Sequence, residues 1–313
     1  MKKLLTIAAL AATTSLGGLA PALAEYPDAP VQFIVPWPPG DFEDILTRMI
    51  AADMQEETGV AASVVNKPGG GDGPFPGALE VLAGPTDGSV VGSFVIGVPV
   101  VGPKIDIGID EDSFVPVGIF LTYPFVLAAS GDAHYTNMAE LATYAQGNDV
   151  VQGHCGGGLT PTKASFAAAK KLDFEFADDA AFDMLDCNTL SSGDADVINT
   201  TLALIEPCLG EINVLANIGS DPIAKLDGVQ TLSAQSGIND LELWNGLFVK
   251  KGTPQEVVDV LAQIAEATMA SDEAQTLMRE TGARVYWQGM AEAQARIAVD
   301  RDKSDELDAI IAQ

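Results

Sequence analysis

Short apolar runs alternate with amphipathic stretches along most of the chain. The apolar runs predict strands, because they are short and rich in β-branched and aromatic residues. They lie at 31–36, 61–66, 89–97, 114–130, 148–153, 194–201, 213–219 and 244–254. Strands that alternate with helices are typical of an α/β protein with mostly parallel sheets. We therefore predict an α/β fold.

The helical pattern is clearest directly after the first strand. Ile45, Leu46, Met49 and Ile50 have the spacing of residues that share one face of a helix. Further helices are predicted around 78–83, at 137–147, from Thr160 onward and, two or three of them, beyond Pro254. Thr160 fits an N-cap and Pro161 the first helical position. The long run 114–130 should break at Tyr123-Pro124.

The first 24 residues have the features of an export signal. Lys2 and Lys3 precede an apolar stretch, and Ala22-Leu23-Ala24 is a small-x-small cleavage site. The apolar stretch is too short to span a membrane, which needs about 20 residues. We therefore predict a signal peptide at 1–24 and a periplasmic mature chain without membrane insertion.

Composition narrows the classes of partner. The remaining length suits two packed domains. The chain carries a formal net charge of −28, spread over all segments, which is poorly suited to nucleic acid or to an anionic membrane. Three cysteines follow the signal, and Cys187 could pair with Cys208 while Cys155 stays unpaired; spacing leaves this pairing open.

Most catalytic signatures are missing from the sequence. There is no phosphate-binding GKS or GKT loop, no G-x-S-x-G elbow and no H-E-x-x-H motif. His134 and His154 are the only histidines, so a multi-histidine metal site cannot form. His154 and Cys155 would point to opposite faces of a strand, which disfavours thiol catalysis. We predict no catalytic residues, no metal and no cofactor.

Four strands end in loops rich in Gly, Pro, Ser or Thr. These loops are 37–44, 67–77, 153–162 and 199–202, and three of them open a helix directly. Any one of them is explained by a tight turn. Because the ends of parallel strands gather at one edge of a sheet, where open α/β folds bind ligands, the four together favour a binding cleft.

The segments "YPDAPVQFIVPWPPGDFEDILTRMIA", "VVNKPGGGDG", "PTDGSVVGSF" and "GLFVKKGTPQEVVDVL" occur in a familiar order and spacing. With them the chain resembles the extracytoplasmic solute-binding proteins of tripartite tricarboxylate transporters, often called the TctC or Bug family. The resemblance runs from Tyr26 to the C-terminal helices. Each motif alone is only moderately specific, whereas the ordered set is strongly so.

The resemblance implies a two-lobed, type II-like periplasmic-binding-protein fold, each lobe a mixed, mostly parallel sheet flanked by helices. Lobe 1 would comprise residues 25–124 and 244–313, and lobe 2 residues 125–243. It also implies that the lobes close on a small organic acid, a carboxylate, which passes to the membrane permease subunits of the transporter. Family members hold carboxylates with backbone N–H groups, hydroxyls and ordered water.

Carried onto this sequence, the resemblance gives a set of expected ligand-binding residues in the loops identified above. They are Trp37, Pro39, Gly40, Asp41, Phe42, Glu43, Asp44, Phe94, Gly97, Cys155, Gly156, Gly157, Gly158, Thr160, Thr162, Thr200 and Thr201. In the second loop the three glycines permit close backbone approach, and the two threonines add hydroxyls at a helix start. Lys67 and Lys163 are the nearest basic candidates, although lysines are mostly solvated.

The opening loop departs from the family pattern. Where relatives have further glycines and a small hydroxyl before the acid aligned with Asp44, this chain has Asp41, Phe42 and Glu43. Three interpretations stay open. Asp41 caps the helix, with Asp44 at capping-box spacing; or Asp41 or Glu43 accepts from a hydroxyl or ammonium of the solute, with Phe42 as an apolar wall; or both acids point to water.

Two other functions remain compatible with the residues. A secreted hydrolase using clustered carboxylates stays open, because 44 acidic residues always yield close pairs; it would show turnover. A binding protein that feeds only a sensor kinase would share the fold of the transporter receptor. The solute receptor is the function that the ordered motifs favour.

Overall fold

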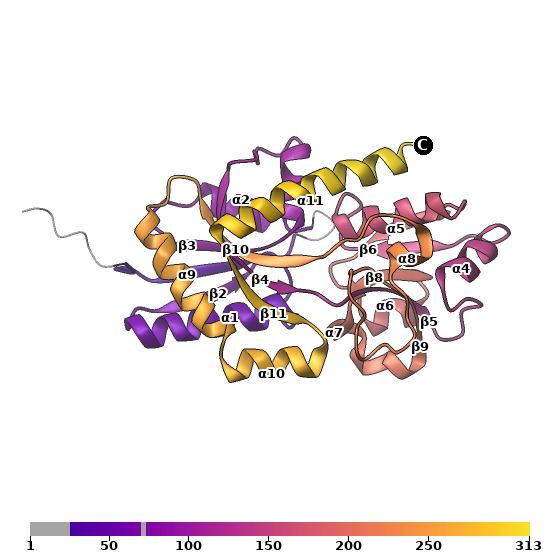
Figure 1. Ribbon diagram of the computed structural model, residues 1–313, viewed down its shortest axis with the longest axis horizontal. Helices are drawn as coiled ribbons and strands as arrows, with labels where there is room; N and C mark the ends of the chain where they lie inside the picture. Colours follow the sequence, from indigo (N-terminus) through magenta and orange to yellow (C-terminus); the bar gives the residue numbers. More distant parts are fainter. Residues whose placement is uncertain (1–25, 70–72) are drawn as a thin grey trace, which may run out of the picture.

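The computed structural model describes residues 26–69 and 73–313, which form two lobes lying side by side (Figure 1). Each lobe is built on one β-sheet covered by helices. This confirms the predicted two-lobed α/β fold. The predicted signal peptide lies outside the described residues.

Lobe 1 is built on a six-stranded sheet in the order β11–β4–β10–β3–β1–β2. Its strands are β1 (Val31–Val35), β2 (Ala62–Asn66), β3 (Val90–Val95), β4 (Phe114–Thr122), β10 (Trp244–Lys250) and β11 (Arg284–Gly289). Strand β1 pairs in parallel with β2 and β3, whereas β10 and β11 run antiparallel to their neighbours. Helices cover the sheet, so its inner strands are buried on both faces and consist of nearly continuous apolar residues.

The helices of lobe 1 lie against this sheet. They are α1 (Phe42–Thr58), α2 (Phe75–Ala83), α3 (Gly97–Val101), the 3₁₀ helix η2 (Gly102–Lys104), α9 (Gln255–Met269), α10 (Asp272–Thr281) and α11 (Met290–Ile311). In α1 the residues Leu46, Ile50 and Met54 recur every fourth position and are completely buried. Ile45, predicted on this face, is instead 37% exposed, because the buried stripe continues through Phe42.

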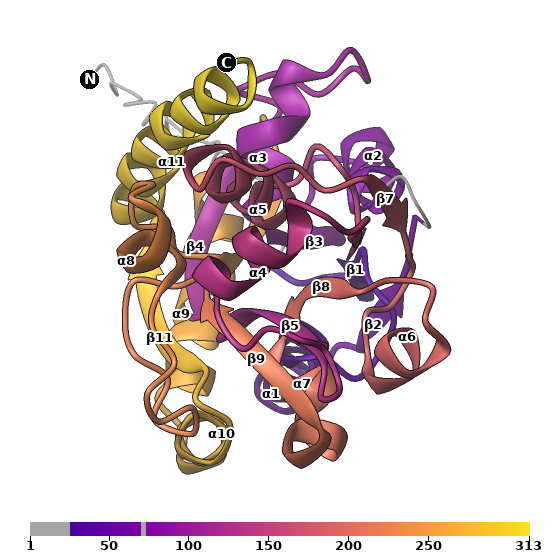
Figure 2. The ribbon, with the colours of Figure 1, turned by 90° about the vertical axis from the view of Figure 1, so that its right-hand side faces the viewer.

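Lobe 2 is built on a five-stranded sheet in the order β7–β6–β8–β5–β9. Its strands are β5 (Phe125–Ser130), β6 (Val151–His154), β7 (Asp178–Ala181), β8 (Val197–Thr201) and β9 (Ile212–Asn217). The helices, seen from this end of the molecule in Figure 2, are α4 (Met138–Ala145), α5 (Thr160–Lys171), α6 (Cys187–Ser192), α7 (Leu202–Ile205), the 3₁₀ helix η3 (Glu206–Glu211) and α8 (Leu232–Ser236). Among the described residues, four of the nine strand pairings are parallel and five are antiparallel, so both sheets are mixed, as expected, but they are not mostly parallel.

Two connections join the lobes in mid-sheet. Strand β4 of lobe 1 ends at Thr122 and β5 of lobe 2 begins at Phe125, which confirms the predicted break at Tyr123-Pro124. The chain returns between β9 and β10. The two lobes are therefore joined by two neighbouring chain segments. This arrangement permits hinge closure.

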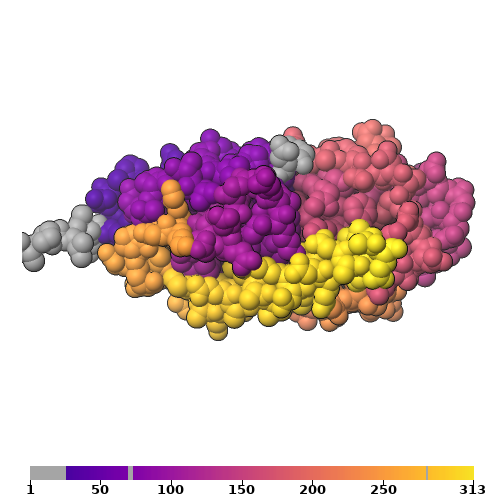
Figure 3. Space-filling view, turned by 90° about the horizontal axis from the view of Figure 1, so that it is seen from above, coloured from indigo at the N-terminus to yellow at the C-terminus, as the bar shows by residue number. Residues whose placement is uncertain are grey.

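Helix α11 spans both lobes. It follows β11 in lobe 1, packs against β4, and extends to α5 of lobe 2 (Figures 1 and 3). Figure 3 shows this helix as a yellow ridge that runs along one face of the molecule. Within the described residues, no helix combines the length and apolarity needed to cross a membrane.

Candidate functional site

A cavity of about 100 Å³ lies between the lobes, where strand ends from both sheets meet. Its walls come from the β1–α1 loop and the start of α3 in lobe 1, and from the β6–α5 loop and the end of β8 in lobe 2. One buried water needs about 10–15 Å³ by the same kind of measure, so this space suits a small solute. The lining includes ten of the expected residues: Trp37, Pro39, Asp41, Glu43, Gly97, Cys155, Thr160, Thr162, Thr200 and Thr201.

Asp41 occupies the N-cap position of α1 and also lines the cavity. Gly40, at φ +112°, makes the turn that brings the chain into the helix. The Asp41 carboxylate accepts from the backbone N–H of Phe42 at 2.8 Å and from the Thr201 hydroxyl at 3.0 and 3.1 Å. Asp41 therefore combines helix capping with a position in the cleft, two roles that the sequence offered as alternatives.

The capping box expected between Asp41 and Asp44 does not form. Asp44 accepts from the N–H of Gly40 at 3.1 Å and pairs with Arg48, whose guanidinium reaches both carboxylate oxygens at 2.8 and 3.0 Å. Asn66 donates to the same carboxylate at 2.9 Å. Asp44 therefore fixes the β1–α1 loop through contacts outside the cavity and does not line the cavity.

Glu43 is buried, with 2% of its surface exposed, which excludes the interpretation that both acids point to water. The Tyr123 hydroxyl lies 3.1 Å from Glu43 Oε2 and 3.3 Å from Asn245 Oδ1. Asn245 in turn donates to Ser93 Oγ at 2.7 Å, and Ser93 is within 2.8 Å of Thr47 Oγ1. This chain of contacts ties the Glu43 side chain to β10, β3 and its own helix.

Burial shifts the titration of both acids upward. Burial raises the pKa of Asp41 to about 6, although the hydrogen bonds from Phe42 and Thr201 act to lower this pKa. The pKa of Glu43 is raised well above its usual value by burial and by the nearby Asp41 charge. An acid with a raised pKa is one whose charge the surroundings do not fully stabilise.

On the lobe 2 side, α5 begins one residue earlier than predicted. Leu159 is the N-cap and Thr160 is the first helical residue, so the Thr160 hydroxyl does not cap the helix. Thr160 is 2% exposed, and its Oγ1 has no hydrogen-bond partner among the described residues. Thr162, by contrast, donates to Gly156 O at 2.9 Å and accepts from Asn199 at 3.2 Å.

The glycines of this loop shape the turn and do not line the cavity. Gly156 is at φ +150°, and its N–H donates to His154 Nδ1 at 3.0 Å, so this donor is used within the loop. Gly157 and Gly158 also lie outside the lining. The other His154 nitrogen, Nε2, lies 2.7 Å from Asp179, so both ring nitrogens are engaged away from Cys155.

Three other expected ligand-binding residues lie away from the cavity. Phe42 is 1% exposed and packs in the lobe 1 core, because the first turn of α1 points it inward rather than into the cleft. Phe94 packs against Phe114 and Phe248 within the same core. Gly40 lies outside the lining as well.

Sequence reasoning missed part of the lining. Tyr123 and Phe125 flank the crossover that was noted only as a strand break, and Asn199 directly precedes the two recognised threonines. The segment 183–185 follows β7, a four-residue strand with two aspartates that carries no apolar signal. Leu243 and Trp244 complete the wall at the return crossover.

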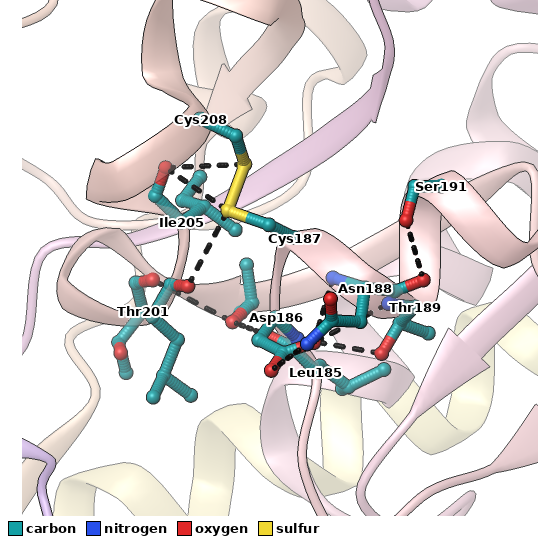
Figure 4. Close-up of a disulfide and its surroundings, with 11 residues drawn as sticks. Leu185, Asp186, Cys187, Asn188, Thr189, Ser191, Thr201, Ile205 and Cys208 are labelled. Carbon is teal, nitrogen blue, oxygen red and sulfur yellow. Dashed lines mark hydrogen bonds between the residues drawn. A yellow bond between two sulfur atoms is a disulfide. The ribbon is translucent and has the colours of Figure 1, made fainter.

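A disulfide supports the lobe 2 wall. Cys187 at the start of α6 is bonded to Cys208 in η3, with Cα atoms 5.9 Å apart, which settles the pairing that spacing left open (Figure 4). Both sulfur atoms lie near the Ile205 carbonyl (Figure 4), and Leu185, two residues before Cys187, accepts from the Thr200 hydroxyl of β8 at 2.5 Å. Cys155 is free, and burial raises the pKa of its thiol to about 12.

A two-lobed α/β fold with a small, largely apolar cavity between its lobes defines a solute-binding protein of the periplasmic-binding-protein class. The family model for the tripartite tricarboxylate transporter family receptor matches residues 46–313, and the chain belongs to this family. This confirms the resemblance drawn from the ordered motifs.

Relatives and structural neighbours agree with this assignment. A protein in the tcbD–tcbE intergenic region of Pseudomonas sp. is 28% identical over 88% of this chain and 84% of its own length. Protein BugT of Bordetella pertussis is 25% identical over 83% of this chain and 82% of its own. The periplasmic binding protein BugD superposes with a TM-score of 0.80 at 23% identity, covering 92% and 99% of the two chains. An R. palustris protein with adipate gives 0.81 at 22% identity, covering 92% and 98%.

Proposed function

We propose that this receptor captures one small organic acid in the cavity between its lobes and delivers it to the permease subunits of a tripartite transporter. The observation that carries the proposal is a pair of buried polar atoms without partners among the described residues. Trp37 Nε1 comes from lobe 1, Thr160 Oγ1 comes from lobe 2, and both residues line the cavity. Buried donors normally have a hydrogen-bond partner. A ligand that accepts from both of these groups would supply the missing partner in each lobe.

Adipate and malate, the ligands named for an R. palustris protein and for MatC from Rhodopseudomonas palustris, are carboxylic acids of suitable size. They support the class of ligand. The lobes that close would be residues 25–124 with 244–313, and residues 125–243, in keeping with the membership of the strands in the two sheets. Closure would follow from a ligand that contacts both lobes.

A thermal-shift screen with mono-, di- and tricarboxylic acids and amino acids tests the proposal. We expect a small subset to raise the melting temperature and to bind one to one by titration calorimetry. Trp37→Phe removes the indole donor and keeps a smaller aromatic ring, and should weaken binding of the best ligand five- to tenfold, the effect of one lost hydrogen bond. Trp287→Phe is the matched control, because Trp287 packs over Gly118 away from the cavity. The proposal fails if no acid binds, or if both variants behave alike.

A further inference from the structure

One part of the cavity lining is acidic. Asp41 at the N-cap and Glu43 in the first turn of α1 both line it. Their described hydrogen-bond donors are neutral groups: the Phe42 N–H and Thr201 hydroxyl for Asp41, and the Tyr123 hydroxyl for Glu43. Neutral donors bring no positive charge to balance either carboxylate. A third acid, Asp183, lines the same cavity and is exposed.

No basic side chain balances this charge among the described residues that line the cavity. Arg48, the nearest arginine in sequence, is bound to Asp44 and Asn66. Lys163 pairs with Asp308 at 2.6 Å, and Lys67 pairs with Glu80 at 3.1 Å. The two lysines that the sequence suggested for anion binding are thus held elsewhere.

Another part of the lining consists of donors. Helix α5 is 12 residues long and begins at Thr160, and this end of a helix favours negative charge. The buried Thr160 hydroxyl, without a described partner, adds a donor there. The unpartnered Trp37 indole N–H comes from the lobe 1 wall. A carboxylate is the ligand group that suits these donors.

We propose that the solute carries an ammonium group as well as a carboxylate, and that Asp41 with Glu43 binds the ammonium. This inference rests on the proposed receptor function and narrows its ligand class to small zwitterionic acids. The ammonium donates up to three hydrogen bonds and supplies the positive charge that the lining lacks. The carboxylate lies toward Thr160 and Trp37.

A solute with two or three carboxylates is disfavoured by the same arrangement. A second anionic group would lie in a cavity of about 100 Å³ that already holds Asp41 and Glu43. Like charges within a few ångströms disfavour each other strongly when they are shielded from water. Charge complementarity of this kind sets specificity through repulsion as much as through attraction.

Matched pairs of acids test the inference by titration calorimetry at pH 7.5. The probes are glycine against acetate, alanine against propionate, and 4-aminobutyrate against butyrate, so that each acid has one carboxylate and the members of each pair differ in the amino group. We expect the amino acid of at least one pair to bind at least tenfold more tightly than its partner. Asp41→Asn and Glu43→Gln should each reduce that ratio at least tenfold. Asp106→Asn removes one charge at an exposed position outside the cavity lining and should change the ratio less than threefold.

Two results would overturn the inference while leaving the receptor function intact. One is binding of the acids without amino groups as tightly as, or more tightly than, their amino counterparts. The other is an unchanged ratio in both Asp41→Asn and Glu43→Gln. If instead these probes and every acid of the wider screen fail to bind, the receptor proposal itself falls, and the inference with it. Asp41→Asn keeps the size of the capping residue, so it remains informative if Glu43→Gln does not fold.

Discussion

Lys163 Nζ on α5 lies 2.6 Å from Asp308 Oδ1 near the end of α11, and this ion pair joins the two lobes. Lys104 of lobe 1 approaches the same aspartate at 3.6 Å and Asp305 at 2.7 Å. The last turns of α11 thus carry charges that contact both lobes. A change in the angle between the lobes would have to break or rearrange these pairs.

We expect Asp308→Asn to loosen this connection with a modest cost in stability. Asp308 is 42% exposed, and exposed ion pairs contribute up to about 1 kcal/mol. The melting temperature should therefore fall by a few degrees, with unchanged ligand selectivity because Lys163 does not line the cavity. Asp305→Asn is the control, because it loses a contact only to Lys104 of lobe 1. Its small-angle scattering profile should match that of the wild type. A selectivity change in Asp308→Asn would contradict this assignment.

The raised pKa of Asp41 predicts a stability that depends on pH. Its pKa is about 6 in the folded protein and about 4 in the unfolded chain, so between these values the folded state binds more protons. Stability from this group is therefore present below about pH 4 and is lost as pH rises through 6. The charged or titratable groups that act on this region are Glu43, Asp44, Asp183, Cys155 and Tyr123.

Asp41→Asn should remove that penalty. In the absence of solute, the variant should match the wild type near pH 4 and exceed its stability by up to about 3 kcal/mol at pH 7.5, as roughly two pKa units imply. Denaturant unfolding at both pH values measures the difference. Glu43 keeps its own raised pKa in the variant, so some pH dependence should remain. An advantage of equal size at both pH values would show that Asp41 acts through packing alone.

The fold and ten of the residues that line the cavity could be predicted because they depend on local patterns. Apolar runs located the inner strands, and Gly-Pro and Thr-rich strand ends located Trp37, Asp41, Thr160 and Thr201. Phe42 could not be assigned to the core or to the cleft from the sequence. The first turn of α1 has residues that face each of them, and the sequence does not fix the residue at which that turn begins. Tyr123 could not be placed either, because its role depends on a hydrogen bond to Glu43, a residue 80 positions away.

The disulfide should contribute substantially to the stability of lobe 2. Cys187 and Cys208 are 21 residues apart, and closing a loop of this length in the unfolded chain stabilises the folded state by about 3 kcal/mol. The double replacement Cys187→Ser with Cys208→Ser should lower the unfolding free energy by roughly that amount. Cys155→Ala, which leaves the disulfide intact, should cost far less. Comparable losses of unfolding free energy in the double variant and in Cys155→Ala would show that the effect comes from packing near the cavity and not from the disulfide.

Cys155 offers a direct probe of the cavity. Its thiol lines the cavity wall and has a pKa of about 12, because burial and the charges of Asp41 and Asp183 disfavour the thiolate. Thiol reagents react with the thiolate, so at pH 8 the folded protein should be labelled several orders of magnitude more slowly than the unfolded chain. A bound solute should slow labelling further, and Asp41→Asn should accelerate it by removing a negative charge. Labelling at the same rate with and without a solute that calorimetry shows to bind would mean that the solute occupies another place on the protein.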